Sequence, residues 1–191
     1  NPIAIAVPAG DHPTVLLDIA TTVVAYGKVK LAAQRGHMIP EGWMIDKTGN
    51  PVTDPSKASE GSLLPIGGYK GYGLALMISL LAGTLNNAAV GMETIDFNTH
   101  HDLITNTGQA IIALDPAAFG DKELFINRVI RVVNDIKNSS KLPDVSEIHI
   151  PGEGAEKLAA ERNLIGIPIS FELLQALNHC AKECGVVPLN L

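Results

Sequence analysis

The sequence predicts a mixed α/β (α+β) fold, because short apolar runs typical of strands alternate with longer runs typical of helices. Residues 107 to 115 predict a core strand that ends at Pro116. Residues 121 to 137 place their apolar side chains along one side of a helix. Because 46% of the 191 residues are hydrophobic and 18% are charged, the chain can bury a substantial core.

The first third of the chain predicts a strand, a helix and a long loop. Residues 14 to 17 predict a short buried strand, and Asp18 is placed as the N-cap of a helix over residues 19 to 35. Gly36 is the expected stop of that helix. Residues 37 to 65 are interrupted by many prolines and glycines, so we expect an irregular excursion over the surface.

The segment Pro65-Ile66-Gly67-Gly68-Tyr69-Lys70-Gly71-Tyr72-Gly73-Leu74 carries the strongest local signal. The apolar run that follows, residues 74 to 85, predicts a buried helix that opens at the glycines. The unpaired amides of a helix start, together with one lysine, suit an anionic ligand. The alternative is a glycine-rich turn that only lets a core helix enter at close quarters.

Two familiar phosphate-binding patterns do not fit this segment. A P-loop has lysine followed by serine or threonine, whereas Lys70 is followed by Gly71. A dinucleotide fingerprint would place its third glycine at Leu76. The segment is therefore neither a P-loop nor a Rossmann fingerprint.

The last third predicts a strand and two helices. Residues 147 to 150 predict a short strand, followed by a tight loop, residues 151 to 154, that opens a helix reaching residue 162. Ser170 is the expected N-cap of a last helix that runs to residue 185. Cys180 and Cys184 share the apolar stripe of that helix, so we expect both sulfurs to face the core.

Composition excludes several classes of protein. The net charge of −6, without a Lys/Arg-rich run, argues against nucleic-acid binding. No apolar run reaches the roughly 20 residues of a membrane span. Two cysteines fit a reducing, cytoplasmic compartment. The side chains of His100-His101-Asp102 diverge from one another, so we expect a polar loop and no metal site.

Several motifs follow one another in order along the whole chain. They are Asn1-Pro2 with Pro8, Leu17-Asp18-Ile19-Ala20-Thr21-Thr22, Ile39-Pro40-Glu41-Gly42-Trp43, Asp54-Pro55, the segment from Pro65 to Leu74, and Ile150-Pro151-Gly152-Glu153. Together they resemble the type 2 malate/L-lactate dehydrogenase family. Members include ureidoglycolate, sulfolactate and malate dehydrogenases, diketogulonate reductase and piperideine-2-carboxylate reductase.

The resemblance implies an NAD- or NADP-dependent oxidoreductase that transfers a hydride between the cofactor and a small 2-hydroxy or 2-oxo acid. It implies a non-Rossmann cofactor fold, a largely antiparallel sheet flanked by helices, and a homodimer. By this resemblance, residues 1–146 are a central cofactor-binding domain, and residues 147–191 carry a cofactor loop and helices that pack on an upstream portion of the same protein. We expect such a portion because the chain begins without methionine inside an apolar run.

The resemblance also assigns site residues. The expected cofactor contacts are Asp18, Ile19, Ala20, Tyr69, Lys70, Pro151, Gly152, Glu153 and Gly154. The expected substrate neighbours are Tyr26 and Gly27. From the residues alone, Asp18 either accepts from ribose hydroxyls or caps a helix, Lys70 either neutralises a phosphate or is solvated, and Glu153 either binds a hydroxyl or stabilises a helix start.

Two departures from the family pattern bear on these assignments. Gly154-Ala155 stand where members often have Arg-Glu, so a basic contact is lost. Lys28 stands where some members have an acidic charge-relay residue, and we assign it no catalytic role.

The resemblance places the catalytic histidine and a substrate-binding arginine upstream of residue 1, so no catalytic residue is assigned in this chain. The alternative functions are an NADPH-dependent cyclic-imine carboxylate reductase and a non-catalytic nucleotide- or anion-binding module.

Overall fold

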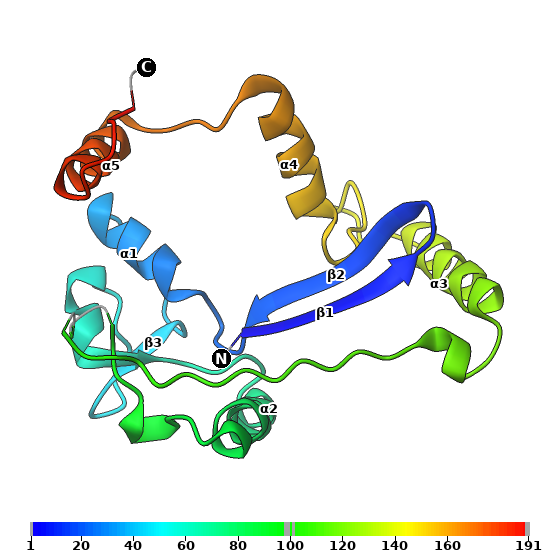
Figure 1. Cartoon of the computed structure of the whole chain (residues 1–191), viewed down its shortest axis with the longest axis horizontal. Coiled ribbons are helices and arrows are strands. Elements are labelled where there is room, and N and C mark those ends of the chain that lie inside the picture. Colours follow the sequence, from blue (N-terminus) through cyan, green and yellow to red (C-terminus); the bar gives the residue numbers. More distant parts are fainter. Residues whose placement is uncertain (1, 98–99, 101, 190–191) are drawn as a thin grey trace. The chain divides into compact units, whose positions relative to one another are not determined.

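The computed structural model describes residues 2–97, 100 and 102–189 (Figure 1). Asn1 and His101, which enter the sequence argument, lie outside the described residues. Contacts between Cα atoms divide the chain into two compact units, Asn1–Asn134 and Asp135–Leu191. Each unit is described by itself.

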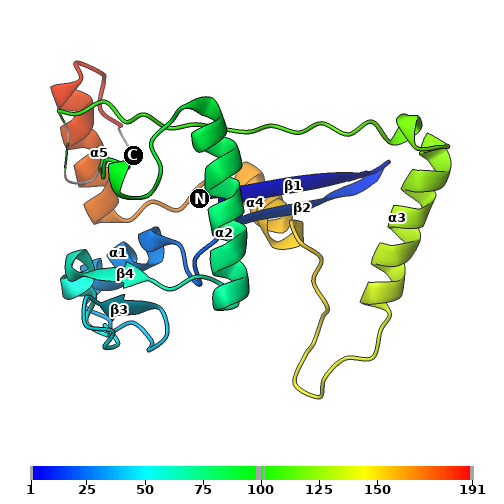
Figure 2. The ribbon, with the colours of Figure 1, turned by 90° about the horizontal axis from the view of Figure 1, so that it is seen from below.

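The first unit opens with an antiparallel hairpin of β1 (Pro2–Ala9) and β2 (His12–Ala20), drawn as the long blue arrows in Figures 1 and 2. Gly10 makes the turn with a φ of +62°. The prediction that Asp18 caps a helix was wrong, because β2 continues through residue 20 and pairs Asp18 with Ala4. The apolar alternation of residues 15 to 19 is that of a half-exposed strand.

The best-packed part of the first unit lies where the sequence predicted an irregular excursion. α1 (Tyr26–Gln34) packs over a small antiparallel pair, β3 (Met44–Asp46) with β4 (Gly61–Leu63), and the 3₁₀ helix η1 (Pro55–Glu60) lies between these strands in sequence. The buried residues of this core are Val24, Val29, Ile39, Met44, Val52 and Ala58. The prolines and glycines that predicted a loop therefore shape a packed unit. Gly36 is confirmed as the helix stop, with a φ of +65° after the C-cap Arg35.

The predicted helix after the glycine-rich segment is confirmed as α2 (Tyr69–Ala82), although it begins five residues earlier than the apolar run. Its predicted burial is wrong. Within the described part of the chain, Gly71 is its one buried residue, and apolar side chains such as Met77 (55% exposed) and Leu81 (49% exposed) face outward.

The predicted core strand over residues 107 to 115 is also wrong. In the described chain this segment is extended but pairs with no strand, and Ile111 and Ile112 are 91% and 79% exposed. An extended apolar run becomes a buried strand only when another strand accepts its backbone hydrogen bonds. The segment follows the short 3₁₀ helices η2 (Thr84–Asn86) and η3 (Gly91–Glu93), and η4 (Pro116–Ala118) ends it.

The amphipathic helix predicted over residues 121 to 137 is confirmed as α3 (Lys122–Lys137). The Asp121 carboxylate accepts from the Leu124 amide at 2.9 Å and so caps its first turn. The turn of the first hairpin contacts this helix, since a Cβ added to Gly10 would lie 3.0 Å from Cγ2 of Ile126.

The second unit contains α4 (Glu153–Ile165) and α5 (Phe171–Glu183), as predicted. Ser170 is confirmed as the N-cap of α5, because its hydroxyl accepts from the Leu173 amide at 3.3 Å. The strand expected over residues 147 to 150 is absent from the described chain.

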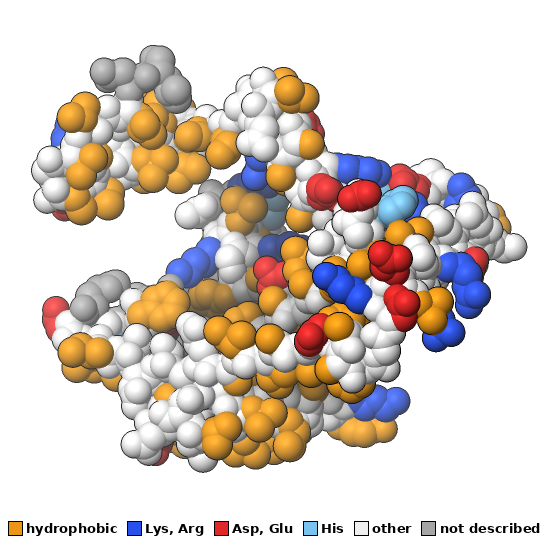
Figure 3. All heavy atoms as spheres, turned by 45° about the vertical axis from the view of Figure 1, so that its right-hand side comes forward, with side chains coloured by type: hydrophobic (Ala, Val, Ile, Leu, Met, Phe, Trp, Pro, Cys, Tyr) orange, Lys and Arg blue, Asp and Glu red, His pale blue; other side chains and the backbone are white. Residues whose placement is uncertain are grey.

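The cysteines were also predicted wrongly. Cys180 and Cys184 are exposed thiols, although they lie on the apolar side of α5. Periodicity identified the apolar stripe correctly, but the stripe is uncovered. Figure 3 shows that hydrophobic side chains, drawn in orange, cover large areas of the face that it draws.

Candidate functional site

A short antiparallel stretch in the first unit, which the sequence did not reveal, pairs residues that follow β2 with residues that precede α2. The Ile66 amide donates to the Thr21 carbonyl at 3.0 Å, and the Val23 amide donates to the Leu64 carbonyl at 2.9 Å. This stretch connects the end of β2, the approach to α1 and the entrance of α2. The buried Thr21, 4% exposed, is the residue at which they are joined.

Asp18, Ile19 and Ala20 form the last three residues of β2. Asp18 is exposed, whereas Ile19 and Ala20 are half-buried. Because side chains alternate along a strand, the Asp18 carboxylate points to the opposite face from Ile19. Asp18 is therefore a solvent-accessible acceptor, which leaves the hydroxyl-binding role open and removes the helix-capping one.

Tyr26 and Gly27 begin α1, the helix that follows this stretch. The Lys30 ammonium lies 5.6 Å from the centroid of the Tyr26 ring, within the range of a cation–π contact. A Cβ added to Gly27 would meet no atom within 4 Å, so the space beside it is open. The predicted substrate neighbours thus lie at an accessible helix start.

Glycine backbone geometry forms the entrance of α2. Gly67 and Gly68 have φ values of +59° and +61°, and Gly68 is the N-cap with no side-chain cap. At Gly71, an added Cβ would lie 1.7 Å from the Ile66 carbonyl oxygen, so the helix crosses that peptide at a distance only glycine permits. The entrance is held by backbone contacts.

Tyr69 and Lys70 are the first two residues of α2, and both are exposed. Among the residues that the structure describes, Lys70 has no ion-pair partner. The first amides of a helix have no partner within the helix and carry its partial positive charge. A mobile ammonium beside such amides forms a site suited to a phosphate or carboxylate.

The fourth predicted segment, Pro151 to Gly154, lies in the second unit. Gly152 is the N-cap of α4 with a φ of +100°. Glu153 and Ile150 exchange hydrogen bonds: the Glu153 amide donates to the Ile150 carbonyl at 3.2 Å, and the Ile150 amide donates to Oε2 of Glu153 at 3.1 Å. This reciprocal pair closes the loop.

The same glutamate takes part in a charge cluster that the sequence did not reveal. The Lys137 ammonium donates to Oε1 of Glu153 and lies 3.6 Å from Oε1 of Glu147. Lys157 pairs with the other oxygen of Glu147 at 3.3 Å. The hydrogen bond from Lys137, followed by the one from the Ile150 amide, holds the pKa of Glu153 below its usual value. Lys137 has its pKa raised, chiefly by the hydrogen bond to Glu153.

Glu147, His149 and Glu153 each offer a ligand atom, and these atoms lie within 4.8 Å of one another. Lys137 already pairs with both carboxylates, and Lys157 pairs with that of Glu147. A cation entering here would face two ammonium groups, so the group behaves as an ion-pair cluster and not as a metal centre.

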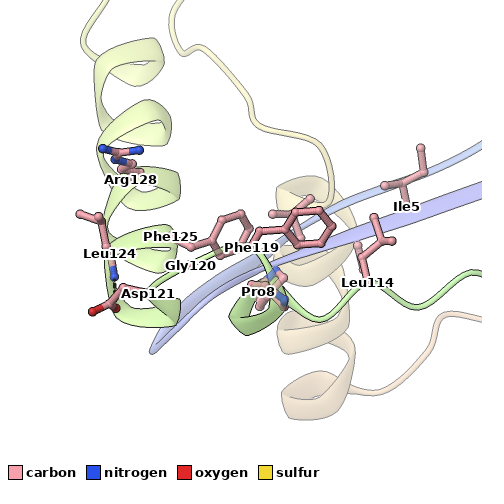
Figure 4. A pocket seen from close by; sticks show the side chains of 12 residues that line it. Ile5, Pro8, Leu114, Phe119, Gly120, Asp121, Leu124, Phe125 and Arg128 are labelled. Carbon is pink, nitrogen blue, oxygen red and sulfur yellow. Dashed lines mark hydrogen bonds between the residues drawn. The ribbon is translucent and has the colours of Figure 1, made fainter.

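A separate apolar pocket of about 450 Å³ lies in the first unit and contains none of the predicted site residues (Figure 4). Figure 4 shows Phe119 and Phe125 projecting into the same space beside the hairpin. The lining residues are Ile5, Ala6, Val7, Pro8, Leu114, Pro116, Phe119, Gly120, Asp121, Leu124, Phe125 and Arg128. Asp121 is used as the cap of α3. The pocket is therefore lined mainly by apolar side chains, with Arg128 as its other charged residue.

The chain is similar in sequence to several known proteins. The chain matches the family model of malate/L-lactate dehydrogenase over residues 1–178. It is 38% identical to the malate/(S)-sulfolactate dehydrogenase of Methanothermus fervidus, over 97% of this chain and 53% of that protein. It is 33% identical to the NAD(+) ureidoglycolate dehydrogenase of Escherichia coli K12, over 93% of this chain and 50% of that protein.

A solved structure agrees with these matches. The sulfolactate dehydrogenase from Methanocaldococcus jannaschii superimposes with a TM-score of 0.81 at 39% identity, over 97% of this chain and 52% of that one. The chain thus spans about half the length of the relatives that it matches.

The relatives named here are dehydrogenases. The chain belongs to the malate/L-lactate dehydrogenase family, as its motifs predicted. Dehydrogenases of this kind typically use nicotinamide cofactors. Within the described residues, we find no helix with the length and apolarity that a membrane crossing requires.

Proposed function

We propose that this chain carries the cofactor-binding part of an NAD- or NADP-dependent oxidoreductase that acts on a small 2-hydroxy or 2-oxo acid of the malate or lactate type. The observation that carries the proposal is the α2 entrance, where two positive-φ glycines and the exposed Lys70 stand at a helix start in a chain of this family. The names of the dehydrogenase relatives support the substrate class.

The residues fit such a cofactor chemically. A dinucleotide carries a pyrophosphate and ribose hydroxyls, and these require cationic or amide donors and an exposed carboxylate acceptor. We assign the phosphate contacts to Lys70 and the first amides of α2, with Tyr69 alongside them. We assign the ribose contacts to Asp18, with the neighbouring Ile19 and Ala20 as backbone and packing contacts.

In the second unit we assign a cofactor contact to the backbone of the loop from Pro151 to Gly154. An added Cβ at Gly154 would meet nothing within 4 Å, so a ligand can approach the backbone there. Tyr26 and Gly27 are assigned to the substrate side, where the Tyr26 ring lies within cation–π range of Lys30. When bound, the nicotinamide supplies or accepts the hydride. The residues of this chain bind and orient it.

The remaining parts of the proposal concern the whole protein. The chain spans about half the length of its relatives, and we place the proton-transferring histidine and a substrate-binding arginine in a part of the protein outside it. We propose a non-Rossmann fold for the cofactor domain, residues 1–146, which the antiparallel pairing of β1 with β2 and of β3 with β4 supports. A second domain over residues 147–191, a homodimer and a cytoplasmic location complete the proposal.

Absorbance at 340 nm tests the function directly. The full-length protein is assayed with NADH and NADPH against oxaloacetate, pyruvate and sulfopyruvate, with piperideine-2-carboxylate included for imine reduction. We expect cofactor oxidation with at least one 2-oxo acid. Turnover of the imine alone would reassign the protein as a cyclic-imine carboxylate reductase. Cofactor binding without any turnover would favour a non-catalytic module.

A further inference from the structure

Charged side chains hold the loop at the start of α4 in place. Both oxygens of Glu153 are engaged: Oε1 accepts from the Lys137 ammonium, and Oε2 accepts from the Ile150 amide at 3.1 Å. The Glu153 side chain is only 18% exposed, and that of Lys137 is 31% exposed. The carboxylate therefore faces the protein.

Lys137 connects two points of the chain that flank the loop. It is the last residue of α3, and it contacts Glu147, which precedes the loop, as well as Glu153, which begins α4. One ammonium group thus ties the end of one helix to the start of the next across a polar linker. Charge-assisted hydrogen bonds of this kind are stronger than neutral ones.

We propose that Lys137 is a positioning residue for the cofactor loop, which it fixes by holding Glu153 in the conformation that accepts the Ile150 amide. Glu153 then acts as a brace, and the loop presents its backbone amides to the cofactor. The role in cofactor binding rests on the proposed function. The two hydrogen bonds that hold Glu153 do not depend on it. A loop held in its binding conformation before the ligand arrives loses less entropy when it binds.

The alternative role for Glu153 is direct acceptance of a cofactor hydroxyl. In the structure, a hydroxyl would have to share an oxygen with Lys137 or with the Ile150 amide. The two roles make different predictions for Lys137. If Glu153 binds the hydroxyl itself, neutralising Lys137 frees the carboxylate and does not weaken cofactor binding. If Glu153 braces the loop, the same change weakens it.

The test compares Lys137→Met with Lys157→Met in the full-length protein. Both changes remove one positive charge from the same cluster, but the hydrogen bond to Glu153 comes from Lys137, whereas Lys157 pairs with Glu147. Two quantities are measured: hydrogen exchange at residues 150 to 156 without cofactor, and the Kd for NADH and NADPH by titration of reduced-nicotinamide fluorescence.

We expect Lys137→Met to speed exchange in the loop and to raise the cofactor Kd about 10-fold, with kcat changed less than 2-fold at saturating cofactor. Lys157→Met should stay within about 2-fold of wild type, because the Glu153 brace remains. Lys137→Arg should restore most of the affinity, since it keeps the charge and the donors.

Unchanged exchange in Lys137→Met, or faster exchange with an unchanged Kd, would overturn the positioning role. If Lys137→Met fails to fold, Glu153→Gln replaces it, because the amide oxygen can still accept from Ile150 while the ion pair is lost. For Glu153→Gln the exchange without cofactor carries the test, because direct hydroxyl binding by Glu153 also predicts a raised Kd. Faster exchange in the loop is expected, and unchanged exchange would overturn the positioning role. Failure of the wild-type protein to bind either cofactor would contradict the proposed function instead, and the exchange measurement would still test the brace.

Discussion

The two glycine-containing helix entrances of this chain are built in different ways. At α2, Gly67 and Gly68 turn the backbone, Gly71 lets the helix cross the Ile66 peptide, and Lys70 remains without an ion-pair partner in the described chain. At α4, the Glu153 carboxylate holds the loop through side-chain bonds. The first entrance leaves its cation available for a ligand, whereas the second uses its charges internally.

This difference separates two ways of building a helix start. A backbone-built entrance depends on glycine at particular positions and should be intolerant of a Cβ. An entrance held by ion pairs should tolerate small changes but respond to pH and to charge removal. Substitutions at matched positions in the two entrances can therefore test the distinction.

The largest effect is expected for Gly71→Ala. The new Cβ would overlap the Ile66 carbonyl oxygen at 1.7 Å, so the α2 entrance must shift. We expect a loss of about 3 kcal/mol in the free energy of unfolding, measured by urea denaturation. The matched control is Gly73→Ala, which meets no atom within 4 Å inside the same helix and should be neutral or stabilising by up to about 1 kcal/mol. Equal stabilities of the two variants would contradict the backbone-built entrance.

The next effect is on cofactor binding at Lys70. Lys70→Ala should raise the Kd for the nicotinamide cofactor about 30-fold, or about 2 kcal/mol, because one charge-assisted contact to phosphate is lost. Stability should change little, since the side chain is exposed. Fluorescence titration measures the Kd, with Lys122→Ala on α3 as an exposed control. A Kd equal to that of wild type in a folded Lys70→Ala protein would remove Lys70 from the site.

A smaller effect is expected at the α4 entrance. Gly152→Ala places a Cβ on a residue with a φ of +100°, which should cost about 1–2 kcal/mol of unfolding free energy. Gly154→Ala, two residues later in the helix, meets open space and should be neutral or slightly stabilising. Thermal unfolding of the pair compares them, and a Gly152→Ala protein as stable as wild type would show that the loop is not held in its left-handed conformation.

The smallest effect is the pH dependence of the brace. Glu153 has a lowered pKa, so it binds fewer protons in the folded state than in the unfolded state. Its contribution to stability is present above the usual glutamate pKa of 4.5 and is lost as the pH falls through the folded pKa. Lys137, with a raised pKa, contributes below 10.5 and loses that contribution as the pH rises through its folded pKa.

Glu153→Gln should therefore flatten the acid limb of the stability profile below about pH 4.5. The other charged or titratable groups of the cluster, Glu147, His149 and Lys157, remain in the variant and serve as its internal reference. Urea denaturation between pH 3 and pH 7 measures the difference. Parallel profiles for Glu153→Gln and wild type would show that the ion pair does not stabilise the fold.

Local sequence signals predicted much of the helical structure. The glycine stop at residue 36, the serine cap at residue 170 and the periodicity of α3 each depend on interactions within a few residues, and the structure confirms all three. The strand expected over residues 107 to 115 failed because a strand also needs a partner, which local pattern does not specify. The core around Met44 was not predicted, because the prolines and glycines near it in sequence are typical of irregular loops.

The sequence predicted the types of residue at the candidate site, but it did not predict which of them the fold brings together. The glycines and Lys70 were identified from the order of residues in one segment. Lys137 was not, because it lies 16 residues from Glu153 and only the turn of the chain brings the two together. The hydrogen bond from Ile66 to Thr21 joins segments that are likewise far apart in sequence. Pairings of this kind have no local pattern.

Hydrogen exchange of the full-length protein with and without NADH or NADPH tests the central claim most directly. The claim is that the α2 entrance is a contact for the nicotinamide cofactor through Lys70 and backbone amides, and that the braced loop before α4 is also a cofactor contact. We predict that the cofactor slows exchange at residues 66 to 73 and at residues 151 to 156, while the amides of α5 are unaffected. Cofactor binding that leaves either segment unprotected would contradict the claim.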